Sequence, residues 1–351
     1  MGILAVESID TVRARFLALS GSRAPGLTAA CAMEPDELAL HQQQEWEAAL
    51  ADARAVSPWH AARLAGLPSD APPASVPTMT RRDLAARFDH IVGTPGAGAR
   101  WAEALVRAGD GPVVTDGGRL VVAADRRTPG GDLTAWSLPD VVGLHLAVLR
   151  WLLRGPTGGV APRRTAAVGA ASRGLSAALV RLAGGTVVPA DRDPAAIADR
   201  LNGIQPDLLA ASAALVAPLA RQADAGRLTL RPRALVAAGP LAPGARRAAL
   251  AAWGIEPVEV YAEAACGVVA TGCGWAGGLH VNEDLVLVEA LDPAGRPVAG
   301  GERAARVLVT PLGGGHALPL LRYELGATAV LWPGPCPCGS GFRRLGEIRS
   351  R

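Results

Sequence analysis

Short apolar runs alternate with amphipathic stretches through the middle of the chain. Each run spans four or five residues rich in alanine, valine and leucine, and the stretches between them have apolar residues at helical spacing. Such alternation is typical of parallel strands joined by helices, so it predicts an α/β fold with a doubly wound sheet. The predicted strands are residues 165–168, 186–189, 208–211, 234–238 and 258–261, and the predicted helices are residues 176–182, 194–201, 213–223 and 244–253.

The two ends of the chain have different patterns. Residues 36–52 and 58–67 have apolar positions at helical spacing, and a proline precedes or begins each stretch. Towards the C-terminus, β-like stretches at residues 284–291 and 306–310 are separated by turns rich in glycine and proline. We therefore predict a helical N-terminal segment (residues 1–75), an α/β subdomain (76–260) and a smaller β-rich subdomain (261–351).

Composition indicates a globular protein and excludes two classes of partner. Half of the 351 residues are apolar, which is enough for a large core. The formal net charge is only +3 and no arginine run stands out, so nucleic-acid binding is not expected. The longest apolar stretch, residues 141–153, is interrupted by His145 and Arg150 and is too short to span a membrane.

The cysteines and the first residues bear on the compartment. Five cysteines are an odd number, and two of them lie in the turn Cys336-Pro337-Cys338, so a disulfide framework is not expected. Residues 1–17 mix acids and arginines into the apolar positions, unlike a signal peptide. Both observations predict a cytoplasmic protein.

Four motifs follow one another in the last ninety or so residues. They are residues 260–267 (VYAEAACG), 278–284 (GLHVNED), 318–327 (LPLLRYELGA) and 334–339 (GPCPCG). In this order and spacing they resemble the phenylacetate–CoA ligase branch of the adenylate-forming superfamily. The resemblance implies the N-terminal domain of an adenylate-forming ligase, with doubly wound sheets and a smaller β-rich subdomain.

The sequence departs from the pattern of that branch where the ligases handle ATP. Ala265 stands where a glutamate would help to hold magnesium, and Ala327 stands where an aspartate would grip the ribose. All 35 basic residues are arginine, so the usual catalytic lysine has no counterpart. By position, the phosphate loop falls at residues 111–120, where an Asp-Gly-Gly turn between apolar pairs predicts a β-hairpin instead. The C-terminal lid domain of the branch is also expected to be missing. These departures argue against ATP and magnesium as cofactors.

Three cysteines and one histidine match a metal-ligand set. Three thiols and an imidazole suit a tetrahedral zinc ion with a closed, structural shell. The spacing is not that of a zinc finger, but the Cys-Pro-Cys-Gly and Gly-Leu-His turns occur together in zinc-containing members of the resembling branch. The alternative is four unrelated residues. The candidate ligands are Cys273, His280, Cys336 and Cys338.

The resemblance also places six residues in the ligase cleft. Tyr261 would stack on adenine or on an aromatic acyl group, and Arg322 would pair with a carboxylate or phosphate. Glu263 is a candidate to replace the lost magnesium ligand. The substrate-binding candidates are Tyr261, Arg322 and Tyr323, and the catalytic candidates are Cys266, His316 and Glu263.

The pair of Cys266 and His316 has two interpretations. A cysteine beside a histidine could accept an acyl group as a nucleophile. A lone cysteine is more often a small buried apolar residue, and a histidine after three glycines is more often exposed to solvent.

Three functions agree with these observations. The leading hypothesis is a repurposed ligase fold that acts without ATP on an acyl or aryl thioester, bound to CoA or a carrier protein, by acyl transfer or cyclisation in specialised metabolism. A thioester is already activated, and the former adenylate cleft would supply an acyl pocket. The alternatives are a divergent ATP-dependent carboxylate-activating enzyme and a non-catalytic scaffold. The candidate partners are a carrier protein and a second copy of this chain in a homodimer.

Overall fold

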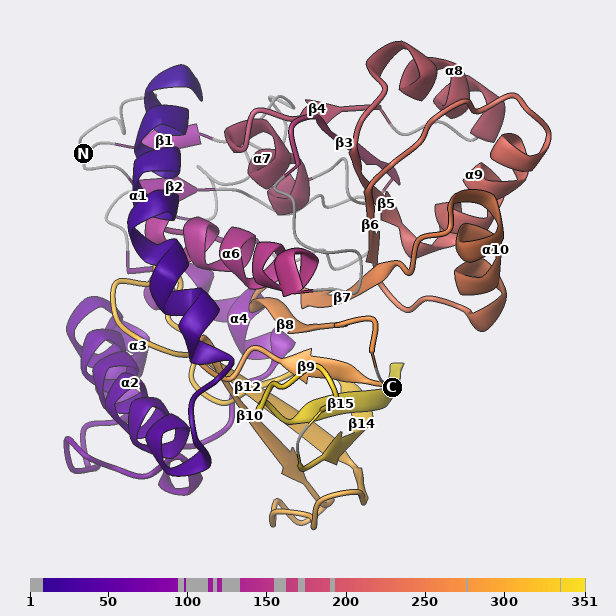
Figure 1. Cartoon of the computed structure of the whole chain (residues 1–351). Coiled ribbons are helices and arrows are strands. Elements are labelled where there is room, and N and C mark those ends of the chain that lie inside the picture. Colours follow the sequence, from indigo (N-terminus) through magenta and orange to yellow (C-terminus); the bar gives the residue numbers. More distant parts are fainter. Residues whose placement is uncertain are drawn as a thin grey trace.

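The computed structural model has a mixed α/β architecture built on one large sheet (Figure 1). The structure describes residues 9–93, 98, 113–115, 119–121, 133–154, 162–169, 174–189, 193–275, 277–334 and 336–350.

The main sheet has ten strands and changes from parallel to antiparallel at β7 (Val258–Glu263). Alternating apolar runs form its parallel half, as predicted, because strands covered by helices on both faces are apolar throughout. The parallel strands beside β7 are β6 (Ala234–Ala238), β5 (Leu208–Ser212), β3 (Thr165–Val168) and β4 (Thr186–Val187). The antiparallel strands are β8 (Gly267–Thr271), β9 (Leu279–Val281), β15 (Arg344–Ser350), β14 (Ala327–Trp332) and β11 (Arg303–Ala304).

Four helices connect the parallel strands and confirm the predicted alternation. The last three bury their apolar stripes in a core with leucines such as Leu201, Leu209 and Leu219, and the first packs in the core shared by α1 and α6. The last of them ends at Gly254, whose φ of 68° is the left-handed conformation that favours glycine after a helix. The helices are α7 (Gly174–Leu182), α8 (Pro194–Ile204), α9 (Ala213–Asp224) and α10 (Pro243–Trp253).

The N-terminal part is helical, as predicted, and one of its helices covers a distant helix. Val12 and Phe16 of the first helix, α1, are buried against the apolar face of α6 (Leu138–Arg154), and the two helices lie side by side in Figure 1. The predicted helix at 58–67 is shorter than expected and ends at Arg63. The N-terminal elements are α1 (Ile9–Ala30), α2 (Pro35–Val56), α3 (Pro58–Arg63), the 3₁₀ turn η1 (Pro73–Ser75) and α4 (Arg81–Ile91).

Two small sheets complete the fold. The predicted stretches at 284–291 and 306–310 form β10 (Val286–Leu291) and β12 (Arg306–Pro311), which pair with each other and, through β12, with β13 (Tyr323–Glu324). The strand pairing of the hairpin predicted at the phosphate-loop position is confirmed, and its turn at residues 116–118 lies outside the described residues. Its strands β1 (Val113–Thr115) and β2 (Arg119–Val121) pair antiparallel. The main sheet continues from β7 into β8, so residue 260 does not interrupt it.

A buried ion pair fixes α6 against the turn that precedes β10. The guanidinium of Arg150 donates to both carboxylate oxygens of Asp284, each at 2.7 Å, and to Asn282 Oδ1 at 2.8 Å. Arg150 is 2% exposed and Asp284 is 8% exposed. Burying either charge alone would cost several kcal/mol, so the pair forces the two elements together.

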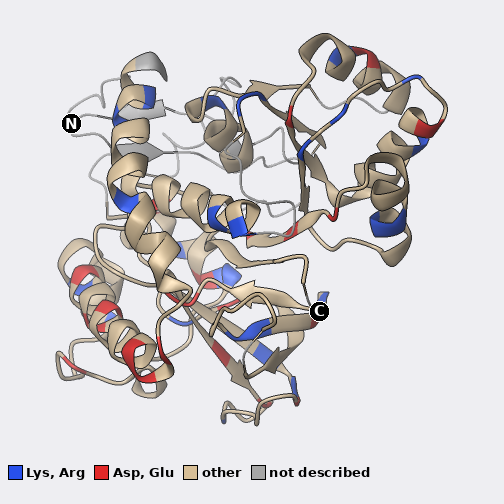
Figure 2. Cartoon of the chain, viewed as in Figure 1, with Lys and Arg blue, Asp and Glu red and all other residues tan. Residues whose placement is uncertain are grey.

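Charges elsewhere are dispersed. Figure 2 shows basic and acidic residues interspersed over both halves of the molecule, and acidic residues recur along α2. Within the described ranges, no helix has both the length and the apolar character needed to cross a membrane.

We expect Arg150→Met to lower the free energy of unfolding by about 3 kcal/mol or more, because Asp284 would stay buried without its partner. The double variant Arg150→Met/Asp284→Leu should recover much of this loss. The exposed pair of Arg296 and Asp292 is the control, and Arg296→Met should lower the free energy of unfolding far less than Arg150→Met. Denaturant unfolding measures all three, and equal losses for the two single variants would contradict the assignment.

Candidate functional site

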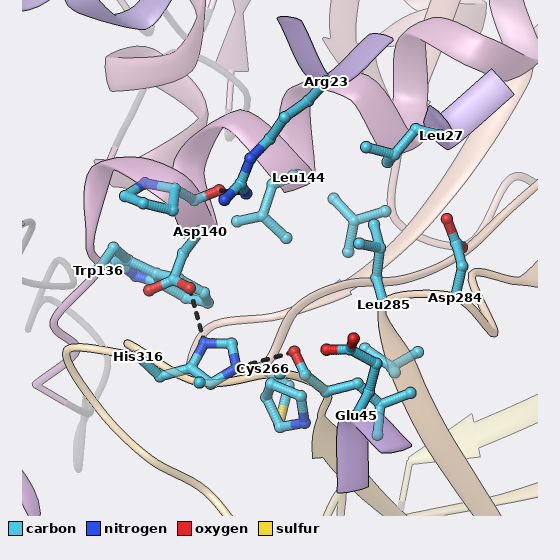
Figure 3. Close-up of a pocket in the computed structure, with 18 of the residues that line it drawn as sticks. Arg23, Leu27, Glu45, Trp136, Asp140, Leu144, Cys266, Asp284, Leu285 and His316 are labelled. Atoms are coloured by element: carbon cyan, nitrogen blue, oxygen red, sulfur yellow. Dashed lines mark hydrogen bonds and ion pairs between the residues drawn. The ribbon is translucent and has the colours of Figure 1, made fainter. Parts of the chain in front are cut away.

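A cavity of about 550 Å³ lies between α1, α2, α6 and the turn that joins β7 to β8. Its walls are mostly apolar. Leu27 comes from α1, Trp136 from the segment before α6, Leu144 from α6, and Leu285 from the turn before β10. Figure 3 shows these side chains around the open space, with polar groups at its edge. Apolar cavities with a few placed polar groups are typical of small-molecule sites.

Both ring nitrogens of His316 are bonded at this edge. Nδ1 lies 2.6 Å from Asp140 Oδ1, and Nε2 lies 3.0 Å from the carbonyl oxygen of Leu312 (Figure 3). Because a carboxylate and a carbonyl only accept hydrogen bonds, both nitrogens donate and the ring is an imidazolium. Burial by itself would lower the pKa of His316, but the Asp140 carboxylate outweighs it and raises the pKa to about 9.

Asp140 also caps α6. Its Oδ2 accepts a hydrogen bond from Ser137 N at 2.8 Å, and Asp140 N donates to Ser137 Oγ at 3.3 Å. Burial would raise the pKa of Asp140, but the charge of His316 holds it below its usual value. The ion pair thus fastens the glycine loop before His316 to the first turn of α6.

The structure places Cys266 in the lining of the same cavity, almost fully buried. Burial, and then the nearby charge of Glu263, raise the pKa of the Cys266 thiol well above its ordinary value, so the thiol is protonated at neutral pH. The Glu263 carboxylate accepts hydrogen bonds from Ala265 N at 2.6 Å and Cys266 N at 3.3 Å, which stabilise the turn. With both nitrogens of His316 engaged, the geometry favours structural roles. The catalytic roles of these three residues stay predictions.

Tyr261 lines a second cavity, of about 590 Å³, together with Pro240, Trp275 and Trp332. Burial, reinforced by the charge of Glu263, raises the pKa of Tyr261 to about 12. Tyr261 and Cys266 therefore line different cavities, although they pack in the same core cluster.

Arg322 and Tyr323 line neither cavity. Arg322 forms a bidentate ion pair with Glu289, at 2.9 and 2.8 Å, and donates to the carbonyl oxygen of Val76 at 2.7 Å. Tyr323 is 1% exposed and belongs to the core around the small sheet. Their predicted roles in substrate binding stay predictions, but in this arrangement both residues hold the N-terminal segment to the sheet.

The candidate metal ligands come together, although 65 positions separate the first from the last. The ligand atoms of Cys273, His280, Cys336 and Cys338 all lie within 4.8 Å of one another. His280 Nδ1 bonds to the carbonyl oxygen of Phe342 at 3.0 Å, so it donates and leaves Nε2 as an acceptor, 3.4 Å from Cys338 Sγ. This orientation is the one that metal-bound histidines usually have. The four residues could hold a metal ion.

Sequence reasoning missed several residues of the first cavity. Arg23, Gly26 and Leu27 reach it because α1 lies over α6, and Glu45 reaches it from α2. No local pattern marks these residues, since apolar spacing predicts that a helix has a buried face but not what that face meets. Asp284 was part of a quoted motif, but its neighbours gave no sign of its partner.

The fold defined by this sheet and cavity is that of the N-terminal domain of adenylate-forming ligases. No protein-family model matches the sequence, and no curated protein matches it. The chain is similar in structure to 2-hydroxyisobutyryl-CoA ligase in complex with 2-HIB-AMP and CoA, with a TM-score of 0.71 and 18% identity over 92% of this chain and 70% of that one. The open conformation of that ligase has a TM-score of 0.68 and 18% identity over 88% and 69%.

The His316–Asp140 pair predicts a pH-dependent stability. The pKa of His316 rises from 6.5 to about 9 on folding, so the stabilisation is complete below pH 6.5 and is lost as the pH rises through 9. His316→Ala should lower the free energy of unfolding by about 3 kcal/mol near pH 6, and by much less near pH 10. The exposed His90 is the control, and His90→Ala should have little effect at either pH. A His316→Ala loss that is the same at both pH values would contradict the pairing.

Proposed function

We propose that this protein is a carboxylate-activating enzyme of the acyl-CoA ligase kind, and that it binds the acyl or aryl part of its substrate in the cavity between α1, α2 and α6. The main support for the proposal is this cavity beside the β7–β8 turn. The chain is also similar, over 92% of its length, to a ligase whose structure contains an acyl-adenylate and CoA. The apolar walls suit an acyl or aryl group. By this likeness the reaction would depend on ATP.

A specific observation favours a second candidate, an enzyme that acts on an acyl or aryl thioester without ATP. Ala265 lines the cavity where the resemblance expects a magnesium ligand, and Ala327 is buried in β14 where it expects a ribose ligand. The Glu263 carboxylate accepts hydrogen bonds from two backbone amides of the turn through Oε2, and its role as a replacement magnesium ligand stays a prediction. Neither alanine has a side-chain oxygen that could bind magnesium or a ribose hydroxyl. The substrate would be a CoA or carrier-protein thioester of specialised metabolism.

The cavity also bears on the scaffold hypothesis. A non-catalytic scaffold has no need of an open apolar cavity, so the volume of about 550 Å³ favours a protein that binds a small molecule.

Calorimetric titration separates the candidates. We expect the wild-type protein to bind an aryl group, offered either as an aryl carboxylate or as its CoA thioester. Micromolar binding of Mg-ATP, with AMP release in the presence of an aryl carboxylate, would support the first candidate. Thioester binding without ATP binding would support the second, and no binding of either would overturn both.

Two glycines of α1 provide a matched test of where the acyl group binds. Nothing lies within 4 Å of a Cβ added at Gly26 or at Gly21, but only Gly26 lines the cavity. Both leucine variants should fold, since leucine has the higher helix propensity. Gly26→Leu should weaken aryl binding by about tenfold or more, and Gly21→Leu should not. Equal affinities would place the acyl group elsewhere.

We propose that the metal of the cysteine–histidine cluster is zinc and that its role is structural. Four ligands fill a tetrahedral shell and leave no position for substrate. The Gly-Leu-His and Cys-Pro-Cys-Gly turns supply His280 and two of the thiols, and this supports the phenylacetate–CoA ligase branch.

Metal analysis of the purified protein should find about one zinc ion per chain. Cys338→Ser should lose it and melt at a lower temperature, since metal binding contributes to folding. Cys338 is only partly buried, so the change itself disturbs little packing. Cys31→Ser is the control, because Cys31 lies in the same core but outside the four ligands. Full zinc content in Cys338→Ser would contradict the ligand set.

A further inference from the structure

The cavity is lined by five side chains that end in a carboxylate or an imidazole, and four of them are bonded within the protein. Asp140 and His316 pair with each other, Asp284 pairs with an arginine of α6, and His41 Nε2 lies 3.1 Å from the carbonyl oxygen of Asp284. In the described part of the chain, the carboxylate of Glu45 has no hydrogen-bond or ion-pair partner. Glu45 is therefore the carboxylate of the described lining that is available to a ligand.

The position of Glu45 is fixed by its neighbours in the chain. Trp46, the next residue, is buried in the core between α2 and the chain after α3, where its Nε1 donates to the carbonyl oxygen of Ala71 at 2.8 Å. The backbone oxygen of Glu45 accepts a hydrogen bond from Gly313 N at 3.1 Å. A Cβ at Gly313 would lie 3.0 Å from Glu45 Oε2, so the glycine leaves the space that this carboxylate occupies. Figure 3 shows the carboxylate beside Cys266 and below Leu285.

The arginine of the lining, Arg23, is not paired with Glu45. Its Nη1 lies 3.4 Å from the carbonyl oxygen of Pro139, at the side of the cavity formed by α1 and α6. Arg23 is exposed, so it lies at the solvent side of the cavity.

An unpaired carboxylate among apolar walls discriminates between ligands. A purely hydrocarbon group would displace water from Glu45 and leave the charge without a partner, at a large desolvation cost. A carboxylate on the end of the ligand that meets Glu45 would be repelled by it. An ammonium or hydroxyl group would instead donate to Glu45 in a charge-assisted hydrogen bond, which is about twice as strong as a neutral one.

We propose that Glu45 determines substrate specificity, and that the acyl or aryl group bound in this cavity carries an amino or hydroxyl group that donates a hydrogen bond to the Glu45 carboxylate. This inference rests on the proposed function, because it requires the acyl group to lie in this cavity. In this proposal Glu45 binds the substrate and takes no part in bond making.

Probes that match in shape and differ only in the donor test the proposal. One pair is aminomethylbenzoate and ethylbenzoate, in which CH₂–NH₃⁺ replaces CH₂–CH₃, and hydroxymethylbenzoate is the neutral donor. Each is titrated as the 3- and 4-substituted isomer, as free acid and as CoA thioester, into wild type, Glu45→Gln and Glu47→Gln. Glu47 lies on the same helix and bonds to Gln43 outside the cavity, so Glu47→Gln is the matched control.

We expect at least one isomer with a donor to bind wild type about tenfold or more tightly than its ethyl counterpart. Glu45→Gln should abolish most of the preference for the ammonium probe, while Glu47→Gln keeps it. If all probes bind wild type without a preference for the donor, the role of Glu45 is overturned and the cavity assignment stands. The same conclusion follows if Glu45→Gln keeps the preference for the donor. If no probe binds wild type, both the proposed function and this inference fail.

Discussion

The buried pairing of Arg150 with Asp284 is the constraint on which the rest of the structure depends. The short turn before β10 is bonded from two sides, because Arg150 of α6 holds the side chains of Asp284 and Asn282 while α2 holds the backbone. From α2, His41 Nε2 lies 3.1 Å from the carbonyl oxygen of Asp284, and Gln42 donates to that of Glu283 at 2.8 Å. A charge this deeply buried needs a partner, so these elements have few other ways to pack.

The same turn connects the cavity with the cysteine–histidine cluster. Trp151 follows Arg150 on α6 and donates from Nε1 to Asn282 Oδ1 at 3.2 Å. Its ring stacks on that of His280, with centroids 4.5 Å apart and planes inclined by 8°. One helix therefore supports the cluster with one residue and the cavity wall with another, Leu144. A metal held by His280 would stabilise the helix against which the acyl group is proposed to bind.

The cavity keeps the shape of a binding site while most of its polar groups are used structurally. His316, Asp140 and Asp284 are bonded to one another or to neighbouring elements, and the buried Cys266 thiol stays protonated. In the proposed function, such a site would recognise an acyl group mainly by shape and by the carboxylate of Glu45, which has no partner among the described residues. Selectivity would then depend on α1 and α2, two N-terminal helices that precede every motif quoted from the sequence.

Sequence alone determined the local structure of this protein. The alternating strands and helices, the hairpin at residues 113–121 and the β10–β12 stretches depend on turn residues and on side-chain periodicity, which act over a few residues. The four residues of the cysteine–histidine cluster were also predictable as a group, because three thiols and an imidazole match a known ligand set. In each case the residue types themselves carry the information.

Only the tertiary structure decided which distant groups meet. Arg150 and Asp284 lie 134 positions apart, and Asp140 and His316 lie 176 positions apart. An arginine that binds substrate and one that binds a glutamate of its own chain look alike in a sequence, and Arg322 proved to be paired with Glu289. The reason is physical. The residue type determines the sign of a charge, but its burial and its partner are determined only when the helices pack.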